Sequence, residues 1–351
     1  MAYQKKTTDN APMKALKQDL RNDTVGKLYV FHGEETYLRD YYLGELKKKL
    51  LPAGLEDFNL HTIAGKECTP ELLAQKVDCF PMMSERTLIV VTDYDLFGGG
   101  ADAKEGYMEL FADLPDYCCV VFVYDLIPYK ADARTKMAAA LKQYGSVVAF
   151  HRQEQGDLVD WIARHFRSTG HEISTEDAKY LLFLCGDLMH SLSAEINKIS
   201  AYAKHPRITR EDIDAVAIPV IDAIVFQMTD AIAAGNFDKA AAVMSDLLGS
   251  QESPIMILSV VGKYFRQLYT ARLARENRKN TQWLMDQWGM KNSWPAEKLM
   301  DAARRYSLPW CRNAVKRCAE TDLAMKSYGG DERDLLVSLI LELANSGRAD
   351  K

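Results

Sequence analysis

The sequence predicts an α/β domain built on a parallel sheet, followed by domains made of helices. Two observations carry this prediction. Short apolar runs rich in β-branched residues alternate with helical patterns as far as about residue 150, and helical patterns follow to the end. The length of 351 residues also exceeds what one hydrophobic core usually organises, so two or three domains are expected.

Strands are expected at five places in the first part of the chain. The run Thr87–Thr92 is continuous and β-branched, which is typical of a strand buried on both faces. The expected strands are Leu28–His32, Phe58–Ile63, Thr87–Thr92, Cys118–Tyr124 and Ser146–Phe150. The helical patterns between them cover Glu35–Leu51, a segment that starts after Thr69, Ala103–Leu114 and Ala131–Gln143. Strands that alternate with crossover helices form a parallel sheet.

After about residue 151 the strand signals stop. Helices are expected over Asp157–Thr169, Thr175–Cys185 and Leu188–Ala203, and a capping box at Thr209 opens a fourth. Pro219 then breaks the chain, and amphipathic helical segments run from Val220 onward. We therefore predict an α/β domain over 1–150, a small helical domain over 151–218 and a larger helical domain over 219–351.

Composition narrows the class of protein. The formal net charge of −5 argues against a protein built mainly to coat nucleic acid, although a local basic patch stays compatible with DNA contact. The 7 cysteines are scattered without a Cys-x-x-Cys pair, which indicates reduced thiols in a cytoplasm and disfavours structural zinc. No apolar run reaches the roughly 20 residues that span a bilayer, and the polar N-terminus does not resemble a secretory signal.

The turn after the first expected strand lies where a phosphate loop would lie. A working loop reads Gly-x-x-x-x-Gly-Lys-Ser/Thr, and here Gly33 is followed by Leu38, Arg39 and Asp40 at the last three defining positions. A leucine side chain blocks the close approach of backbone N–H groups to phosphate. Nearby carboxylates repel phosphate, which Arg39 offsets in part. The turn is thus a degenerate phosphate loop, or alternatively an ordinary strand-to-helix turn of an unrelated fold.

No catalytic constellation or metal site is predicted. Asp93 and Asp95 follow a strand, where acidic residues can hold Mg²⁺ beside ATP, but they lack a phosphate loop as partner and are interpreted as loop-forming residues. The histidines show no metal-ligand spacing, and no Gly-x-Ser-x-Gly nucleophile motif is present. We expect no cofactor.

Several segments, in this order and spacing, resemble one family. They are Leu28–Glu35, Phe80–Arg86, Leu192–Lys198, Ile221–Gly235 and Val261–Leu273. Over roughly Lys27 to Leu343 the chain resembles the delta subunits of the bacterial DNA polymerase III clamp loader. The resemblance implies an AAA+-like fold that has lost its ATP site, with a helical lid domain and a C-terminal helical collar.

The same resemblance implies partners and a role. Delta subunits join the ATPase (tau/gamma) subunits and a delta-prime subunit in a ring, contact the beta sliding clamp and favour its open form. Primer-template DNA is handled within this complex, in the cytoplasm. The Ser-Arg-Cys trio and the cysteine zinc module of the sister subunits do not occur here.

The family's clamp-contacting segment maps to Phe80, Pro81, Met82 and Met83. Pro81 is expected to end the preceding helix, and the adaptable methionine side chains suit an apolar pocket on a partner. The alternative is that these side chains pack beneath the adjacent sheet. The Pro-Met-Met sequence departs from the family's aliphatic-plus-aromatic wedge, which leaves the individual anchors open.

A basic stretch marks a candidate DNA contact. Arg272, Arg275, Arg278 and Lys279 are expected on one broad side of a helix, where they would attract phosphates. The alternative is a solvated helix face. Two other functions also stay open: an active AAA+ ATPase with a noncanonical loop, and a DNA-binding regulator.

Overall fold

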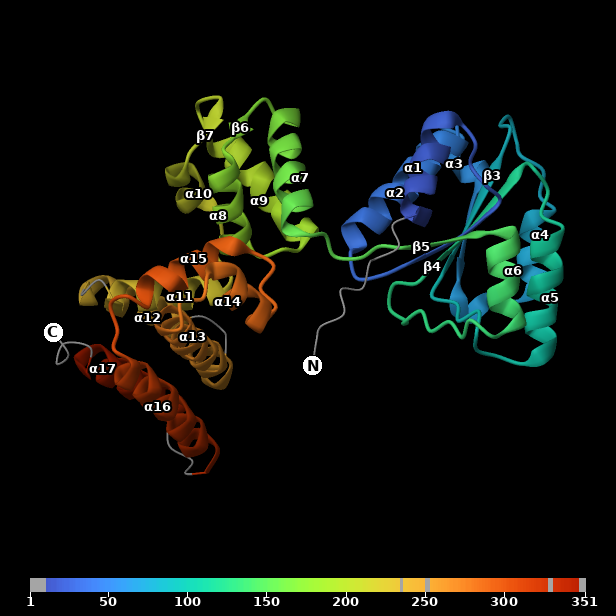
Figure 1. The fold of residues 1–351 in the computed structure, drawn as a ribbon. Coiled ribbons are helices and arrows are strands. Elements are labelled where there is room, and N and C mark those ends of the chain that lie inside the picture. Colours follow the sequence, from blue (N-terminus) through green and yellow to red (C-terminus); the bar gives the residue numbers. More distant parts are fainter. Residues whose placement is uncertain (1–10, 234–235, 250–252, 328–330, 347–351) are drawn as a thin grey trace. The chain divides into compact units, whose positions relative to one another are not determined.

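The chain folds into two compact units. The computed structural model describes residues 11–233, 236–249, 253–327 and 331–346. Contacts divide the chain into residues 1–152 and 153–351 (Figure 1). The further division of the helical part at 218 stays a prediction.

The described part of the first unit contains a five-stranded sheet in the order β2-β3-β4-β1-β5, with all neighbouring pairs parallel. The strands are β1 (Leu28–His32), β2 (Leu60–Ala64), β3 (Thr87–Thr92), β4 (Cys118–Val123) and β5 (Ser146–Ala149). The predicted parallel sheet is confirmed. β2 begins two residues later than expected, because Glu56–Asn59 form the short helix α3.

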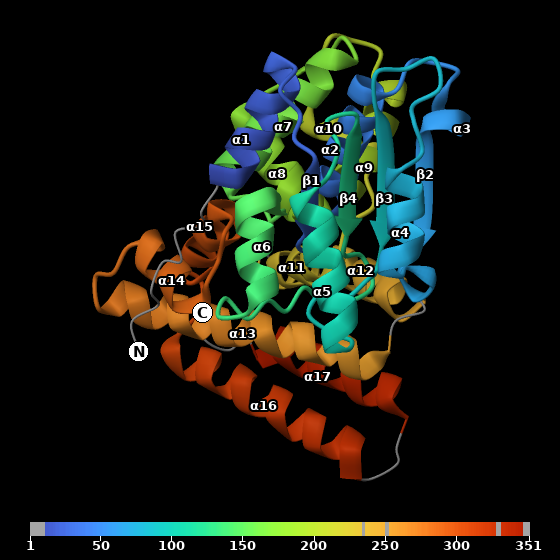
Figure 2. The same ribbon diagram turned by 90° about the vertical axis from the view of Figure 1, so that its right-hand side faces the viewer.

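Both faces of the sheet are covered by helices (Figures 1 and 2). Alternate strand residues point to opposite faces, so Val30 packs with α4, α5 and α6 while Phe31 packs with α1 and α2. The helices are α1 (Ala11–Asn22), α2 (Thr36–Leu50), α4 (Pro70–Val77), α5 (Ala101–Ala112) and α6 (Lys136–Tyr144). Leu16 of α1 is fully buried, although the sequence pattern had not predicted this helix.

Side-chain caps set where two of these helices begin. Thr69 accepts a hydrogen bond from the Leu72 N–H and Pro70 takes the first helical position, as predicted. The prediction that the last helix of this unit begins at Ala131 is wrong. Thr135 caps α6 instead by accepting from the Ala138 N–H, so the helix starts at Lys136.

The second unit begins with four helices and a short pair of strands. The helices are α7 (Gln155–Ser168), α8 (Thr175–Cys185), α9 (Met189–Tyr202) and α10 (Arg210–Val216). The prediction that strands stop after residue 151 is wrong, because β6 (Glu172–Ile173) pairs in parallel with β7 (Arg207–Ile208). The capping box is confirmed: Thr209 and Asp212 each accept from the other's backbone N–H.

The remaining helices share one apolar core. They are α11 (Ile221–Ala233), α12 (Phe237–Gly249), α13 (Pro254–Glu276), α14 (Thr281–Trp288), α15 (Ser293–Ala302), α16 (Leu308–Ser327) and α17 (Glu332–Ser346). A parallel sheet domain followed by an all-helical region confirms the predicted fold class. Among described residues, no single helix has the length and apolar character to cross a membrane; by length and composition alone, one sharply bent pair, Arg210–Val216 with Ile221–Ile232, meets the test.

Candidate functional site

Three apolar side chains project from the loop between α4 and β3. We call residues 80–84 the apolar loop. Phe80 is 77 % exposed, Met82 55 % and Met83 86 %. The alternative that these side chains pack beneath the sheet is therefore wrong. Exposed apolar side chains gathered in one short segment are typical of a protein–protein contact.

The backbone of the apolar loop is held from below by one buried side chain. The Asn59 carboxamide accepts from the Met82 N–H at 2.8 Å and donates to the Met82 carbonyl at 2.9 Å. It also donates to the Leu55 carbonyl at 3.1 Å, and Asn59 is fully buried. Both backbone groups of Met82 are thereby satisfied while its side chain faces solvent.

The C-terminal side of the loop is also fixed. Met83 takes a left-handed backbone conformation with φ of +54°, which turns the chain sharply. The Arg86 guanidinium then donates to the carbonyls of Val25, Gly26 and Cys118. The prediction that Pro81 ends the preceding helix is wrong, because α4 already ends at Val77.

Gly33, the remaining glycine of the degenerate phosphate loop, has a packing role. Its φ is +129°, and a Cβ built there would lie 2.2 Å from the Phe150 carbonyl oxygen. That same oxygen accepts from the Glu35 N–H at 3.0 Å, and the Phe150 N–H donates to His32 at 2.7 Å. The turn is thus hydrogen-bonded to the chain after β5. The Glu35 N–H, which in a phosphate loop would be free to bind the ligand, is used in this contact.

Arg39 fills the position of the lysine, but its charge is used internally. The side chain is 5 % exposed and its guanidinium lies 2.8 Å from Asp125 and 3.0 Å from Asp40. It also donates to the Tyr124 carbonyl at 3.1 Å. A guanidinium buried among two carboxylates and a carbonyl is not available for a phosphate. Leu38, at the second glycine position, packs against the core under α1 and α2.

The neighbouring histidine adds no positive charge at neutral pH. Burial, with a smaller contribution from His151, lowers the pKa of His32 to about 4. Its ring stacks on Tyr129 with centroids 4.2 Å apart. Neither Arg39 nor His32 therefore offers a free positive charge that could replace the missing lysine.

Asp93 and Asp95 shape loops. One Asp93 oxygen accepts from the backbone N–H groups of Asp125, Leu126 and Ile127. Burial alone would raise the pKa of Asp93, but these donors outweigh it and lower the pKa below its usual value. Asp95 accepts from the Phe97 N–H at 3.0 Å. Within the described residues, no group of three or more His, Cys, Asp or Glu side chains could hold a metal ion.

The sequence had predicted that the four candidate DNA-contacting residues lie on one side of a single helix. This prediction is wrong. α13 ends at Glu276, so Arg278 and Lys279 lie beyond it; Arg278 has a φ of +54°, which ends the helical path. Arg272 lies 3.4 Å from Glu276, which partly offsets its charge, and it also donates to the carbonyl of Ala303, just after α15. Arg275 is half-buried on the last turn, whereas Arg278 and Lys279 are exposed.

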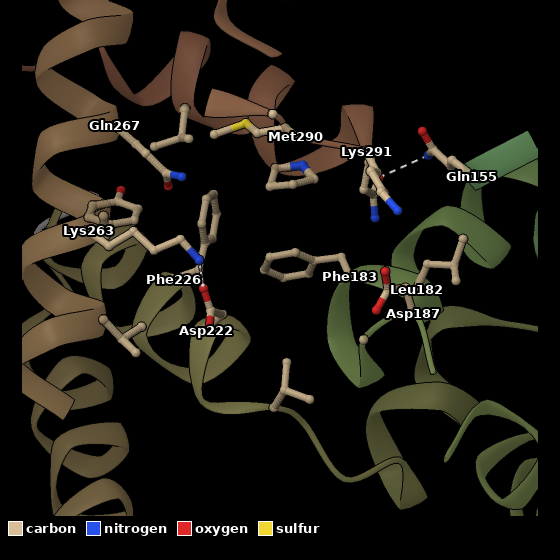
Figure 3. A pocket seen from close by; sticks show the side chains of 18 of the residues that line it. Gln155, Leu182, Phe183, Asp187, Asp222, Phe226, Lys263, Gln267, Met290 and Lys291 are labelled. Atoms are coloured by element: carbon tan, nitrogen blue, oxygen red, sulfur yellow. Dashed lines mark hydrogen bonds and ion pairs between the residues drawn. The ribbon is translucent and has the colours of Figure 1, made fainter. Parts of the chain in front are cut away.

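A cavity of about 440 Å³ lies within the second unit (Figure 3). Phe183, Phe226 and Met290 contribute apolar walls, and Lys263 pairs with Asp222 at 2.6 Å on its rim. The lining carries two lysines and two aspartates: Lys263, Lys291, Asp187 and Asp222. Because these charges balance, the cavity offers no excess positive charge to a nucleotide's phosphates.

The fold defines a class: a parallel-sheet α/β domain followed by a helical region, in which the turn after β1 lacks the residues of a working phosphate loop. Residues 222–343 match the family model "DNA polymerase III delta subunit, C-terminal domain". The DNA polymerase III subunit delta of Bacillus subtilis is 24 % identical over 93 % of this chain and 95 % of its own length. A probable counterpart from Aquifex aeolicus is 23 % identical over 88 % of this chain and 89 % of its own.

A solved structure agrees in fold. The Bacillus subtilis DNA clamp loader delta protein YqeN superposes with a TM-score of 0.56 and 22 % identity, covering 95 % of this chain and 99 % of that one. Residues 222–343 therefore match the C-terminal domain of the DNA polymerase III delta-subunit family, and over most of its length the chain is similar to delta subunits.

Proposed function

We propose that this protein binds a bacterial beta sliding clamp through the apolar loop and opens the clamp ring, without hydrolysing ATP itself. The observation that carries the proposal is the combination of exposed apolar side chains, Phe80, Met82 and Met83, with a backbone held by buried hydrogen bonds. A contact surface ordered before binding loses little conformational freedom when the partner arrives.

Opening follows from binding if the loop prefers the open clamp. A ligand shifts an equilibrium between two states by the difference between its affinities for them. An apolar wedge that fits a pocket accessible in the open ring would favour that ring in this way. The proposal needs no chemical step on this chain.

The degenerate phosphate loop supports the absence of ATP hydrolysis. Arg39 is buried in its own ion pairs, the partly buried Leu38 packs against the core, and Gly33 allows the close contact with Phe150. Energy for the cycle must then come from ATPase partners. We propose that the tau/gamma subunits and a delta-prime subunit fill this role, with the helices from 219 onward as the collar that joins them, in the bacterial cytoplasm.

One experiment separates these functions. We expect the isolated chain to bind a bacterial sliding clamp equally well with and without MgATP, and calorimetry to detect no MgATP site tighter than about millimolar, near −4 kcal/mol. A micromolar ATP site would favour the alternative of an active ATPase. Tight binding to DNA without any partner, and no binding to the clamp, would favour a DNA-binding regulator.

DNA contact is proposed as a secondary role of the basic residues at the end of α13. Changing Arg278 and Lys279 to alanine should weaken binding of primed DNA by the assembled clamp loader and reduce the salt dependence of that binding. Each lost phosphate contact lowers the slope of log K against log salt by about 0.9. The pair Lys48→Ala with Lys142→Ala, exposed in the first unit, is the control. An unchanged salt slope would contradict the contact.

A further inference from the structure

We propose that Asn59 is the positioning residue of the apolar loop: its carboxamide fixes the Met82 backbone so that the neighbouring apolar side chains point outward to the partner. This inference rests on the proposed function, because it assigns the groups that prepare the binding loop. Asn59 itself is fully buried and would not touch a partner.

The Asn59 side chain bonds to the Met82 backbone in the way that the backbone of a neighbouring β-strand would. A carboxamide offers one donor and one acceptor side by side, and Asn59 uses them on the carbonyl and the N–H of the same residue, Met82. Its second N–H bonds to Leu55 at 3.1 Å, which fixes the orientation of the amide plane. All three contacts lie within the part of the chain that the structure describes.

The location of Asn59 links the loop to rigid structure. Asn59 ends α3 and immediately precedes β2, one of the two edge strands of the described five-stranded sheet. The loop therefore takes its position from the sheet edge, although Met82 lies 23 residues further along the chain. Met83 follows with a φ of +54°, a conformation that a non-glycine residue keeps when its surroundings hold it.

Loss of this support should be felt as disorder of the loop. Without the Asn59 side chain, both Met82 backbone groups lose their partners and the loop gains other conformations. The exposed methionines can then fold back onto apolar surface. Binding must then order the loop again, which reduces affinity without removing any contacting atom.

The test compares Asn59→Ala with two other variants of the full-length chain. We measure hydrogen exchange of the 80–86 segment, affinity for a bacterial sliding clamp, and the melting temperature. We expect loop exchange to rise and clamp affinity to fall about tenfold in Asn59→Ala. Asn59→Asp keeps the acceptor for the Met82 N–H and loses both donated bonds. If the alanine variant folds poorly, loop exchange and clamp affinity are measured on Asn59→Asp instead. Phe111→Leu, which changes a buried core residue of α5, should lower the melting temperature without raising loop exchange or reducing clamp affinity.

The outcomes distinguish this inference from the proposed function. Unchanged loop exchange in Asn59→Ala would overturn it. Unchanged clamp affinity would also overturn it, provided that the variant Met82→Ala with Met83→Ala loses affinity in the same assay. If that methionine variant binds the clamp normally, the proposed function itself has failed, and the positioning role in clamp binding falls with it.

Discussion

Changing Met82 and Met83 together to alanine is expected to weaken clamp binding by roughly a thousandfold, because two anchors at about 2 kcal/mol each amount to about 4 kcal/mol. The melting temperature should stay nearly constant, since both side chains are exposed. Clamp opening should fall with binding, whereas assembly with the other clamp-loader subunits should not change. Affinity and thermal unfolding are measured on the same preparation.

Leu126 supplies a matched control for this experiment. It is 86 % exposed, the same fraction as Met83, and lies on a different loop of the same unit. Leu126→Ala should leave clamp affinity unchanged. A stable methionine variant that binds the clamp as tightly as the parent chain would contradict the proposed contact.

Gly33→Ala is expected to destabilise the first unit by about 3 kcal/mol or more. The backbone there has a φ of +129°, and the added Cβ would meet the Phe150 carbonyl oxygen at 2.2 Å. Strain of the backbone and displacement of the chain after β5 both contribute. For a domain of about 150 residues this corresponds to a fall of roughly 6–12 °C in melting temperature, measured by calorimetry.

Gly44→Ala is the control for the glycine variant. Gly44 lies within α2, and an added Cβ would have no heavy atom within 4 Å. Alanine should therefore stabilise the chain by about 0.5–1 kcal/mol, through its better helix propensity. Should Gly33→Ala melt like the parent chain, Gly33 would not be a packing glycine.

The sequence predicted those elements whose signal is local. Thr87–Thr92 is β-branched at every position except Leu88 and forms β3 with the predicted bounds. The start of α4 is set by two adjacent residues, Thr69 and Pro70. The elements that were missed depend on distant partners. β6 and β7 are two residues each, and they become strands because Ile173 and Ile208 pair across 35 positions. No periodic pattern can develop in so short a segment.

The candidate site was predictable in part for the same reason. Leu38, Arg39 and Asp40 stand in adjacent positions that can be compared with a motif, so the sequence alone shows that this turn lacks the residues of a working phosphate loop. The roles of Asn59 and Arg86 were not, because the hydrogen bonds of Asn59 reach across 23 residues and those of Arg86 across 32 to 61. Exposure of the apolar loop likewise depends on these distant contacts.

The buried guanidinium of Arg39 has a consequence for timing. In an enzyme with a working phosphate loop, binding and release of the nucleotide can switch the domain between two conformations. Arg39 belongs to the chain itself and cannot dissociate, because its ion pairs with Asp125 and Asp40 are part of the folded structure. Arg39 therefore gives this turn no bound nucleotide whose hydrolysis could switch the conformation of the first unit. If the apolar loop binds and releases a clamp in cycles, neighbouring subunits must control when the loop is exposed and when it is covered.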